Sequence, residues 1–340
     1  MRRQYVMRVV LGGGMALLMA AAAAQACELC AIYSADSARG QSSQGFLFTM
    51  SEQFVESGRL QFEGEEIDFP GGDHLTSSIT HLVPTWNFSS RFGLSASVPL
   101  VYRSFRTTEQ VFGAPAPVTE EGTEFGLGDM SLIGRFNVLQ KTEMDYALVV
   151  NLLGGVKFPT GDSDRIRKEV EQARIFENLP GIPHEDPLDH SLSSVHQHDI
   201  SAGSGSYDGI LGITANTRWK RWIFNAQFQY YIRTPGESDF EYGDELMVSG
   251  GPGAYLLLQD SFTLLLQANA GYETRGRDTI LGRKSDRTGL TAWYMGPQLA
   301  FTWGEHFAAN AGIDIPLRIA NNGFQNVPDY RVHGGLSVRF

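Results

Sequence analysis

The feature that most constrains this chain is the strict alternation of side chains in its last segment, Tyr330 to Phe340. Every second residue from Tyr330 onward is apolar, aromatic or glycine, whereas the residues between them include Arg331, His333 and Arg339. Side chains alternate between the two faces of a β-strand. The segment is therefore predicted to be a strand with one apolar face and one polar, cationic face. An edge strand of a soluble sheet and a wall strand of a membrane barrel both have such faces.

The chain ends on an aromatic residue, Phe340, which favours the barrel. The segment resembles the assembly signal of outer-membrane β-barrels, in which apolar residues alternate around a glycine before a terminal aromatic residue. This resemblance implies that Tyr330, Gly334 and Phe340 form the signal. It also implies two partners, the β-barrel assembly machinery and outer-membrane lipid.

The start of the chain carries the pattern of a secretory signal peptide. Three arginines precede an apolar run from Val9 to Ala23, which is followed by Ala24-Gln25-Ala26. We predict that residues 1–26 are removed after secretion through the inner membrane, and that residues 27–43 form a periplasmic segment. With 38 acidic against 27 basic residues, the chain has no basic patch for nucleic acid, which excludes that partner.

The two cysteines, Cys27 and Cys30, stand close together in Cys-Glu-Leu-Cys at the predicted mature N-terminus. We predict a small disulfide, because the periplasm is oxidising. Lipidation of Cys27, a redox pair and half of a metal site are the alternatives. A histidine does not follow Cys30, which argues against haem attachment, and the sequence predicts no cofactor.

From residue 44 onward, long alternating segments are joined in turn by very short turns and by longer polar loops. Several apolar faces carry aromatic residues near their ends, as the interfacial girdles of a membrane barrel do. We therefore predict an all-β fold, a transmembrane antiparallel barrel of about twelve strands over residues 44–340, with short periplasmic turns and long extracellular loops. The predicted strands are 44–57, 75–88, 91–104, 124–139, 144–158, 206–219, 221–234, 243–258, 261–274, 289–303, 306–319 and 329–340.

Two features fit this pattern less well. Glu52 shares a face with Phe46, Phe48 and Met50, which makes the first strand the weakest assignment. Prolines occur inside several predicted strands, where they cannot donate to the ladder. They indicate either bulges that adjust curvature or a kink that opens a lateral exit in the wall. These prolines are Pro84, Pro99, Pro252, Pro297 and Pro316.

The polar faces of the strands mix arginine with amide side chains, which suits a wet, hydrogen-bonding path through the barrel. We predict these residues to line the pore. They are Arg91, Arg103, Arg135, Asn151, Lys157, Asn216, Arg218, Asn225, Gln227, Gln229, Gln267, Asn269, Gln298, Asn310, Asp314, Arg318, Arg331, His333 and Arg339.

Three motifs rich in glycine and aspartate stand at predicted strand ends: 125–129 (FGLGD), 155–162 (GVKFPTGD) and 203–208 (GSGSYD). Their order resembles the outer-membrane transporter family named for the meta-cleavage pathway of phenol degradation. The resemblance implies a barrel that admits hydrophobic or aromatic compounds. The residues alone favour loop anchoring, with a direct substrate role as the alternative. The motif residues are Gly126, Gly128, Asp129, Pro159, Gly161, Asp162, Gly203, Gly205, Ser206 and Asp208.

The longest predicted loop spans residues 160–205, and loops of this length are functional or disordered more often than not. Apolar residues among charges predict a short amphipathic helix over 163–176. Further along, His184, His190, His196 and His198 are candidates for a metal site. A solvated loop, or one that folds into the lumen and constricts the pore, is the favoured alternative.

The sequence thus favours a passive channel in the bacterial outer membrane, for uptake or efflux of small, hydrophobic or aromatic solutes. A scaffold for a metal or a redox partner, based on the cysteines or the histidine-rich loop, is the second hypothesis. The third is a lipid hydrolase, for which 190–193 (HSLS) is the nearest candidate. This candidate lies in a predicted loop and lacks the His-x-Ser spacing on a lipid-facing strand. We therefore expect that the chain is not an enzyme.

Overall fold

The computed structural model describes residues 44–68, 72–109, 118–180, 185–188 and 193–340. The predicted signal peptide, the segment 27–43 and the cysteines Cys27 and Cys30 lie outside the described residues.

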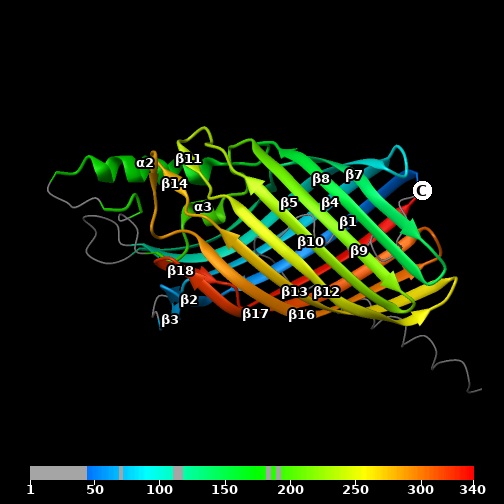
Figure 1. The fold of residues 1–340 in the computed structure, drawn as a ribbon. Coiled ribbons are helices and arrows are strands. Elements are labelled where there is room, and N and C mark those ends of the chain that lie inside the picture. Colours follow the sequence, from blue (N-terminus) through cyan, green and yellow to red (C-terminus); the bar gives the residue numbers. More distant parts are fainter. Residues whose placement is uncertain (1–43, 69–71, 110–117, 181–184, 189–192) are drawn as a thin grey trace, which may run out of the picture.

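The described chain forms one closed antiparallel barrel of twelve strands, as predicted (Figure 1). Each wall strand pairs with its neighbour in the sequence, and the first wall strand pairs with the last and closes the cylinder. The wall strands are β1 (Gly45–Ser57), β4 (His74–Asn87), β5 (Phe92–Glu109), β6 with β7 (Val118–Leu127 and Ser131–Thr142), β8 (Tyr146–Lys157), β9 (Asp208–Trp219), β10 (Trp222–Ile232), β12 (Glu245–Leu258), β13 (Phe262–Arg275), β16 (Leu290–Trp303), β17 (Phe307–Asn321) and β19 (Tyr330–Arg339).

The single strand predicted over 124–139 is two strands, β6 and β7, which pair one after the other with β5. The ladder is interrupted at residues 128–130, opposite Pro99. Gly128 donates its N–H to the Pro99 carbonyl at 2.8 Å, and a Cβ on Gly128 would lie only 2.9 Å from the Pro99 ring. The glycine therefore lets the chain pass the proline and keep the direction of the strand.

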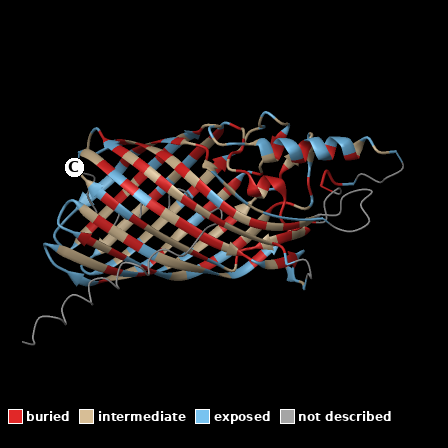
Figure 2. Ribbon diagram, turned by 180° about the vertical axis from the view of Figure 1, so that it is seen from behind, coloured by how far each residue is buried: buried red, intermediate tan, exposed pale blue. Residues whose placement is uncertain are grey.

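The wall has two faces of opposite character. Figure 2 shows the resulting checkered alternation of buried and exposed residues along the strands. On β10, the outward-facing Trp222, Phe224 and Phe228 are exposed, whereas Gln229 and Tyr231 on the inner face are buried. Large exposed apolar side chains recur around the wall, a composition that suits contact with lipid and not with water.

Glu52 lies on the outward face of β1, the face that also carries Met50 and the other apolar residues. Its carboxylate accepts hydrogen bonds from the hydroxyls of Ser78 and Thr80 on the neighbouring strand β4. These bonds explain how an acidic residue is accommodated on an otherwise apolar face.

The two ends of the barrel differ. At one end lie short turns, the start of β1 and the C-terminus; at the other lie the long connections (Figure 1). The long connections carry two small sheets and two helices: α2 (Asp164–Glu177), α3 (Gln197–Ile200), β2 (Arg59–Phe62), β3 (Glu65–Glu66), β11 (Phe240–Glu241), β14 (Thr279–Ile280), β15 (Arg283–Lys284) and β18 (Phe324–Val327). We call this end the mouth.

The helix predicted over 163–176 is present as α2, and its apolar side covers a small core at the mouth. Ile166, Val170 and Ala173 pack with Phe240 and Ile280 from two other loops. In the described part of the chain, neither helix has the length and apolar character needed to cross a membrane.

Two of the strand prolines coincide with irregularities in the ladder. Pro99 faces the interruption between β6 and β7, and Pro316 stands where the register of β17 against β16 shifts by one residue. Both positions agree with the interpretation that prolines mark bulges.

Candidate functional site

The inner face of the barrel carries almost all residues predicted to line the pore. Those on the inner face, buried or half-buried, are Arg103, Arg135, Asn151, Lys157, Asn216, Arg218, Asn225, Gln227, Gln229, Gln267, Asn269, Gln298, Asn310, Asp314, Arg331, His333 and Arg339. Whether a solute passes them stays a prediction.

Two residues of that prediction are placed elsewhere. Arg91 lies exposed in the short turn between β4 and β5. Arg318 is exposed and directly opposite the outward-facing Trp293, because the register shift next to Pro316 reverses the alternation. Directly opposed residues of an antiparallel pair share a face, so Arg318 points out of the barrel. An alternation counted from the sequence cannot detect such a bulge.

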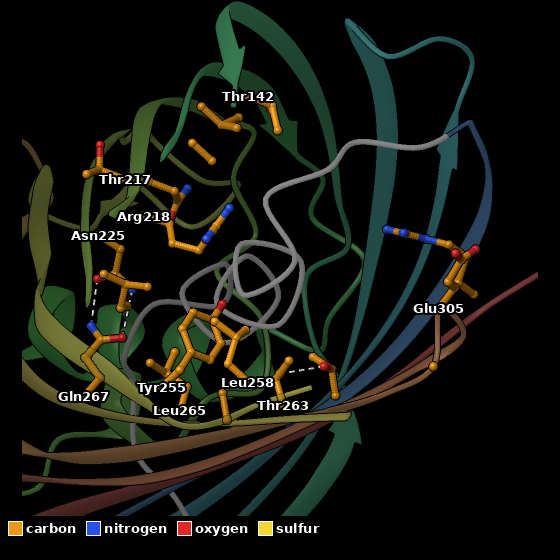
Figure 3. A pocket seen from close by; sticks show the side chains of 18 of the residues that line it. Thr142, Thr217, Arg218, Asn225, Tyr255, Leu258, Thr263, Leu265, Gln267 and Glu305 are labelled. Atoms are coloured by element: carbon orange, nitrogen blue, oxygen red, sulfur yellow. Dashed lines mark hydrogen bonds between the residues drawn. The ribbon is translucent and has the colours of Figure 1, made fainter. Parts of the chain in front are cut away.

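A large cavity opens at the short-turn end of the lumen, with a volume of about 520 Å³ (Figure 3). We call it the vestibule. Amide and hydroxyl side chains share its walls with apolar ones such as Val149 and Leu265. Asn225 and Gln267 exchange two hydrogen bonds, at 2.9 and 2.7 Å, and the hydroxyls of Thr263 and Thr302 are 2.6 Å apart. Arg218 contributes a positive charge to the lining. This arrangement offers water and small polar solutes many neutral partners.

Above the vestibule, six buried side chains on the inner faces of six strands form a cluster that we call the apolar belt: Val83, Ile133, Leu153, Ile210, Tyr231 and Met247. On β8, Val149 faces the vestibule, Leu153 belongs to the apolar belt and Lys157 lies at the mouth. The belt therefore lies between the two ends of the lumen, on six of the twelve wall strands. We did not predict it, because apolar residues were assigned to the outward face. The signal was present, since Ile133 and Leu153 have the same parity as the polar residues Arg135 and Asn151.

The three glycine- and aspartate-rich motifs meet at the mouth in one junction. Asp129 of the first motif accepts hydrogen bonds from Lys157 Nζ at 2.8 Å and from the N–H of Gly161 at 3.0 Å, both of the second motif. It also accepts bonds from the N–H and hydroxyl of Ser204 of the third motif, at 2.8 and 2.6 Å. A single buried carboxylate thus joins all three motifs.

A second buried carboxylate extends this junction. Asp208 lies 2.8 Å from Lys157 Nζ and 2.9 Å from Arg233 Nη1, and Arg233 is also bonded to Glu245 at 2.7 Å. Ser206 donates its hydroxyl to Asp208 at 2.9 Å. Buried charges of both signs therefore alternate and neutralise each other, as buried ionic groups must.

The glycines of the motifs allow backbone segments to touch. A Cβ on Gly203 would lie 2.4 Å from the carbonyl of Gly161, a distance that no side chain tolerates. Pro159 and Asp162 flank this contact on the second motif. The backbone carbonyl of Asp162 accepts a hydrogen bond from the N–H of Gly203 at 2.8 Å. Gly205 has a φ of +70°, where glycine is strongly preferred, and a Cβ on Gly126 would make only an ordinary contact, at 3.7 Å from Ala202 Cβ. The geometry agrees with the loop-anchoring interpretation.

Residues 193–206, which we call the plug segment, lie across the mouth on the inner face of the wall. Their side chains are nearly all buried. Thr107 of β5 donates to the Val195 carbonyl at 3.0 Å and bonds to Ser193, while Arg103 donates to the Ser201 carbonyl. Of the two alternatives for this loop, the structure has the one in which the loop folds into the lumen.

Within the plug segment, His198 is buried between acidic residues from three elements. Its Nδ1 lies 2.8 Å from Glu169 of α2, and its Nε2 lies 3.5 Å from Asp278 and 3.7 Å from Asp199. Burial opposes the charged form, but these carboxylates outweigh it and raise the pKa of His198 to about 9. Correspondingly, burial alone would raise the pKa of Glu169, yet His198 holds it below its usual value. The protonated histidine is therefore an electrostatic link between the plug segment and its surroundings.

The metal prediction is only partly covered by the structure. His184 and His190 lie outside the described residues. His196 and His198 stack with ring centroids 5.3 Å apart, but no group of three or more metal-ligating side chains with suitable geometry exists among the described residues.

Comparisons with known proteins identify the fold. No protein-family model matches the chain, and no curated protein matches it either. The motif resemblance to the phenol-pathway transporter family therefore stays a prediction. Among solved structures, an outer membrane channel from Pseudomonas putida F1 matches with 12% identity over 88% of this chain and 97% of that chain, with a TM-score of 0.59.

Two further solved structures match with lower TM-scores. The translocator domain of the autotransporter NalP from Neisseria meningitidis has 11% identity over 91% of this chain and 93% of that chain, with a TM-score of 0.42. The CymD monoaromatic hydrocarbon channel has 7% identity over 95% of both chains, with a TM-score of 0.40. At these identities the likeness concerns the fold alone.

Proposed function

We propose that this protein is a channel in the bacterial outer membrane that passes small solutes by diffusion through its lumen. The observation that carries the proposal is the inversion of the wall, apolar outside and polar inside, around a vestibule of about 520 Å³. Lipid requires the first face and an aqueous path requires the second. A soluble barrel would have no use for the exposed Trp222, Phe224 and Trp293.

Small hydrophobic or aromatic compounds are the solutes that we propose. The path from the vestibule to the mouth crosses the apolar belt, which favours compounds with an apolar body over bare ions. The P. putida structure, described as an outer membrane channel, supports the channel role by fold, and the phenol-pathway resemblance of the motifs supports the solute class. Diffusion through the lumen would follow the concentration gradient of the solute.

Liposome swelling tests the channel role. Vesicles that contain the refolded mature protein are diluted into an iso-osmotic solution of arabinose, and swelling is followed by light scattering. We expect faster swelling than in protein-free vesicles. Swelling at the protein-free rate, with the barrel fold verified by heat-dependent gel mobility, would contradict the proposal.

The other two hypotheses gain little support from the described residues. For a hydrolase, Ser193 would need a histidine to activate it; its hydroxyl is instead bonded to the Val195 carbonyl and to Thr107. His190 and Ser191 lie outside the described residues, as do the cysteines on which the scaffold hypothesis depends. Metal analysis of the purified protein and of a Cys27→Ser variant remains the direct test of that scaffold role.

A further inference from the structure

Four oxygen-bearing side chains meet at the mouth where the plug segment begins, and we call them the oxygen cluster: Asp73, Ser193, Ser194 and Asn326. Asp73 directly precedes β4, Asn326 belongs to β18, and the two serines open the plug segment. Asp73 Oδ2 lies 3.2 Å from Ser194 Oγ and 3.4 Å from Ser193 Oγ. Ser194 Oγ in turn lies 2.8 Å from Asn326 Oδ1. The cluster thus joins the plug segment to two other connections of the mouth.

The carboxylate of this cluster is buried without a cation. Asp73 is 6% exposed, and Ser193 and Ser194 are 1% and 4% exposed. Within the described ranges of the chain, Asp73 forms no ion pair, and its second oxygen, Oδ1, is buried and has no hydrogen-bond partner. Buried carboxylates are normally paired with a cation or fully hydrogen-bonded. Asp73 therefore has a negative charge that the surrounding side chains do not balance.

The two serine hydroxyls cannot fully satisfy this carboxylate, because each hydroxyl has a single hydrogen to donate. Ser194 can donate it to Asn326 Oδ1 at 2.8 Å or to Asp73 at 3.2 Å. Ser193 can donate it to the Val195 carbonyl at 2.9 Å or to Asp73 at 3.4 Å. For both hydrogens, Asp73 competes with a closer acceptor. The cluster is therefore rich in oxygens and poor in hydrogens.

An oxygen-rich cluster of this kind suits a hard cation. The Nδ2 of Asn326 donates to the carbonyls of Ser57 and Asp73, so its Oδ1 is held toward Ser194. Ca²⁺ binds six to eight oxygens at about 2.3–2.6 Å. Two oxygens that are about 3.2 Å apart subtend roughly 80° at a cation about 2.4 Å from each, which suits neighbouring ligands of a pentagonal bipyramid. Mg²⁺ requires a tighter octahedron and loses its water reluctantly, which favours Ca²⁺ here.

We propose that the oxygen cluster is a Ca²⁺ site that fixes the start of the plug segment at the mouth. Asp73 supplies the negative charge, Ser194 and Asn326 supply neutral oxygens, and water completes the coordination. Its single carboxylate sets it apart from groups of three or more histidine, cysteine or acidic residues, of which the described residues have none suited to a metal. One carboxylate places the affinity among the weaker protein sites for Ca²⁺, with a Kd of about 0.1–1 mM. The proposal does not depend on the channel function.

Calorimetric titration of the chelator-treated, detergent-solubilised mature protein with CaCl₂ tests the proposal, with MgCl₂ as the comparison. We expect one Ca²⁺ per barrel in this range of affinity, and Mg²⁺ binding that is about tenfold weaker. Asp73→Asn removes the charge and should weaken Ca²⁺ binding about tenfold or more. Asp145→Asn is the matched control, because Asp145 is exposed in the short turn between β7 and β8, and it should leave the affinity unchanged.

A second variant keeps the test decisive if Asp73→Asn does not fold. Ser194→Ala retains the carboxylate and removes one oxygen ligand, and it should weaken Ca²⁺ binding severalfold. Absence of Ca²⁺ binding to the intact protein, or an unchanged affinity in either variant of the cluster, would overturn the site. Equal losses in Asp73→Asn and Asp145→Asn would also overturn it, because they would show adventitious binding to acidic groups only.

Discussion

The mouth and the vestibule are two ends of one lumen, yet they use polar side chains in opposite ways. At the mouth, Lys157, Asp208 and Arg233 are charged, buried and bonded to one another. In the vestibule, Asn225 and Gln267 are neutral and face a cavity of about 520 Å³. Buried ion pairs hold backbone segments in place, because breaking one pair leaves a buried charge without a partner. Neutral amides exchange partners with water at low cost, which suits a path for solutes.

The polar side chains thus hold backbone segments together at the mouth, whereas they line a cavity in the vestibule. At the mouth, the ion pairs hold the loops that carry the plug segment. We therefore expect passage of solutes through the mouth to depend on the plug segment. Function in the vestibule depends on the charge and size of its lining. Changes at the two ends should therefore have effects of different kinds, on stability at the mouth and on selectivity in the vestibule.

The largest effect is expected from Lys157→Met, which leaves Asp129 buried without its cation and Asp208 with Arg233 alone. We expect a loss of about 3–5 kcal/mol in the free energy of unfolding, measured by urea titration in detergent micelles. The matched control is Lys141→Met, since Lys141 and Glu143 form an ion pair that is 60% exposed on both sides. That change should leave the urea midpoint nearly unchanged, because exposed ion pairs contribute little to stability. Equal losses in the two variants would mean that the mouth junction is not a structural centre.

A smaller loss is expected from Gly203→Ala, because the new Cβ would overlap the backbone of Gly161. We expect about 1–3 kcal/mol, measured in the same urea titration, since the two loops must separate. Gly126→Ala is the control, where the nearest atom to the new Cβ is 3.7 Å away. If both variants unfold at the same urea concentration, the close contact of the second and third motifs is not required.

A weaker, local effect is expected from pH. The pKa of His198 in the folded protein, about 9, is above its ordinary value of 6.5. The imidazolium therefore stabilises the closed mouth fully below about pH 6.5, and this contribution is lost as the pH rises through 9. We expect more frequent conductance fluctuations at pH 10 than at pH 6 in planar bilayers. His198→Gln should fluctuate at both pH values; if the variant keeps the pH dependence of the intact protein, another group is responsible.

The smallest effect on stability, with a clear effect on selectivity, is expected from Arg218→Glu in the vestibule. Among the described residues, Arg218 donates to the carbonyls of Lys220 and Met144 and pairs with no carboxylate, so its loss leaves no charge there unpaired. Reversal potentials in a salt gradient should shift toward cations. Arg331→Glu is the contrasting variant, because Arg331 is bonded to Glu273 at 2.6 Å and its reversal should destabilise the barrel. Unchanged reversal potentials in Arg218→Glu would remove Arg218 from the conducting path.

The architecture was predictable because lipid and water impose opposite requirements on alternating residues. Ten or more positions per strand repeat this signal, so a single Glu52 on the wrong face does not hide it. Local departures were not predictable. Arg318 points outward because of a register shift beside Pro316, and the interruption at 128–130 arises opposite Pro99. Both depend on the neighbouring strand and not on the residues alone.

The site was predictable only in its parts. The motif residues Asp129 and Asp208 were recognised as candidates, but their shared partner Lys157 was assigned to the pore lining. Which carboxylate pairs with which cation depends on distances between loops, which the sequence does not contain. The apolar belt was missed for a similar reason: a few apolar residues such as Ile133 on a polar face have meaning only when other strands supply their neighbours.

The central claim is that the plug segment narrows an otherwise open barrel, and its most direct test is planar-bilayer conductance with and without residues 163–202. The structure makes this deletion feasible, because Asp162 and Gly203 already lie in contact, joined by a hydrogen bond of 2.8 Å. We expect small conductance steps from the intact protein and larger, steady steps from the variant. Equal conductance in both proteins, with the barrel fold verified by heat-dependent gel mobility, would contradict the claim.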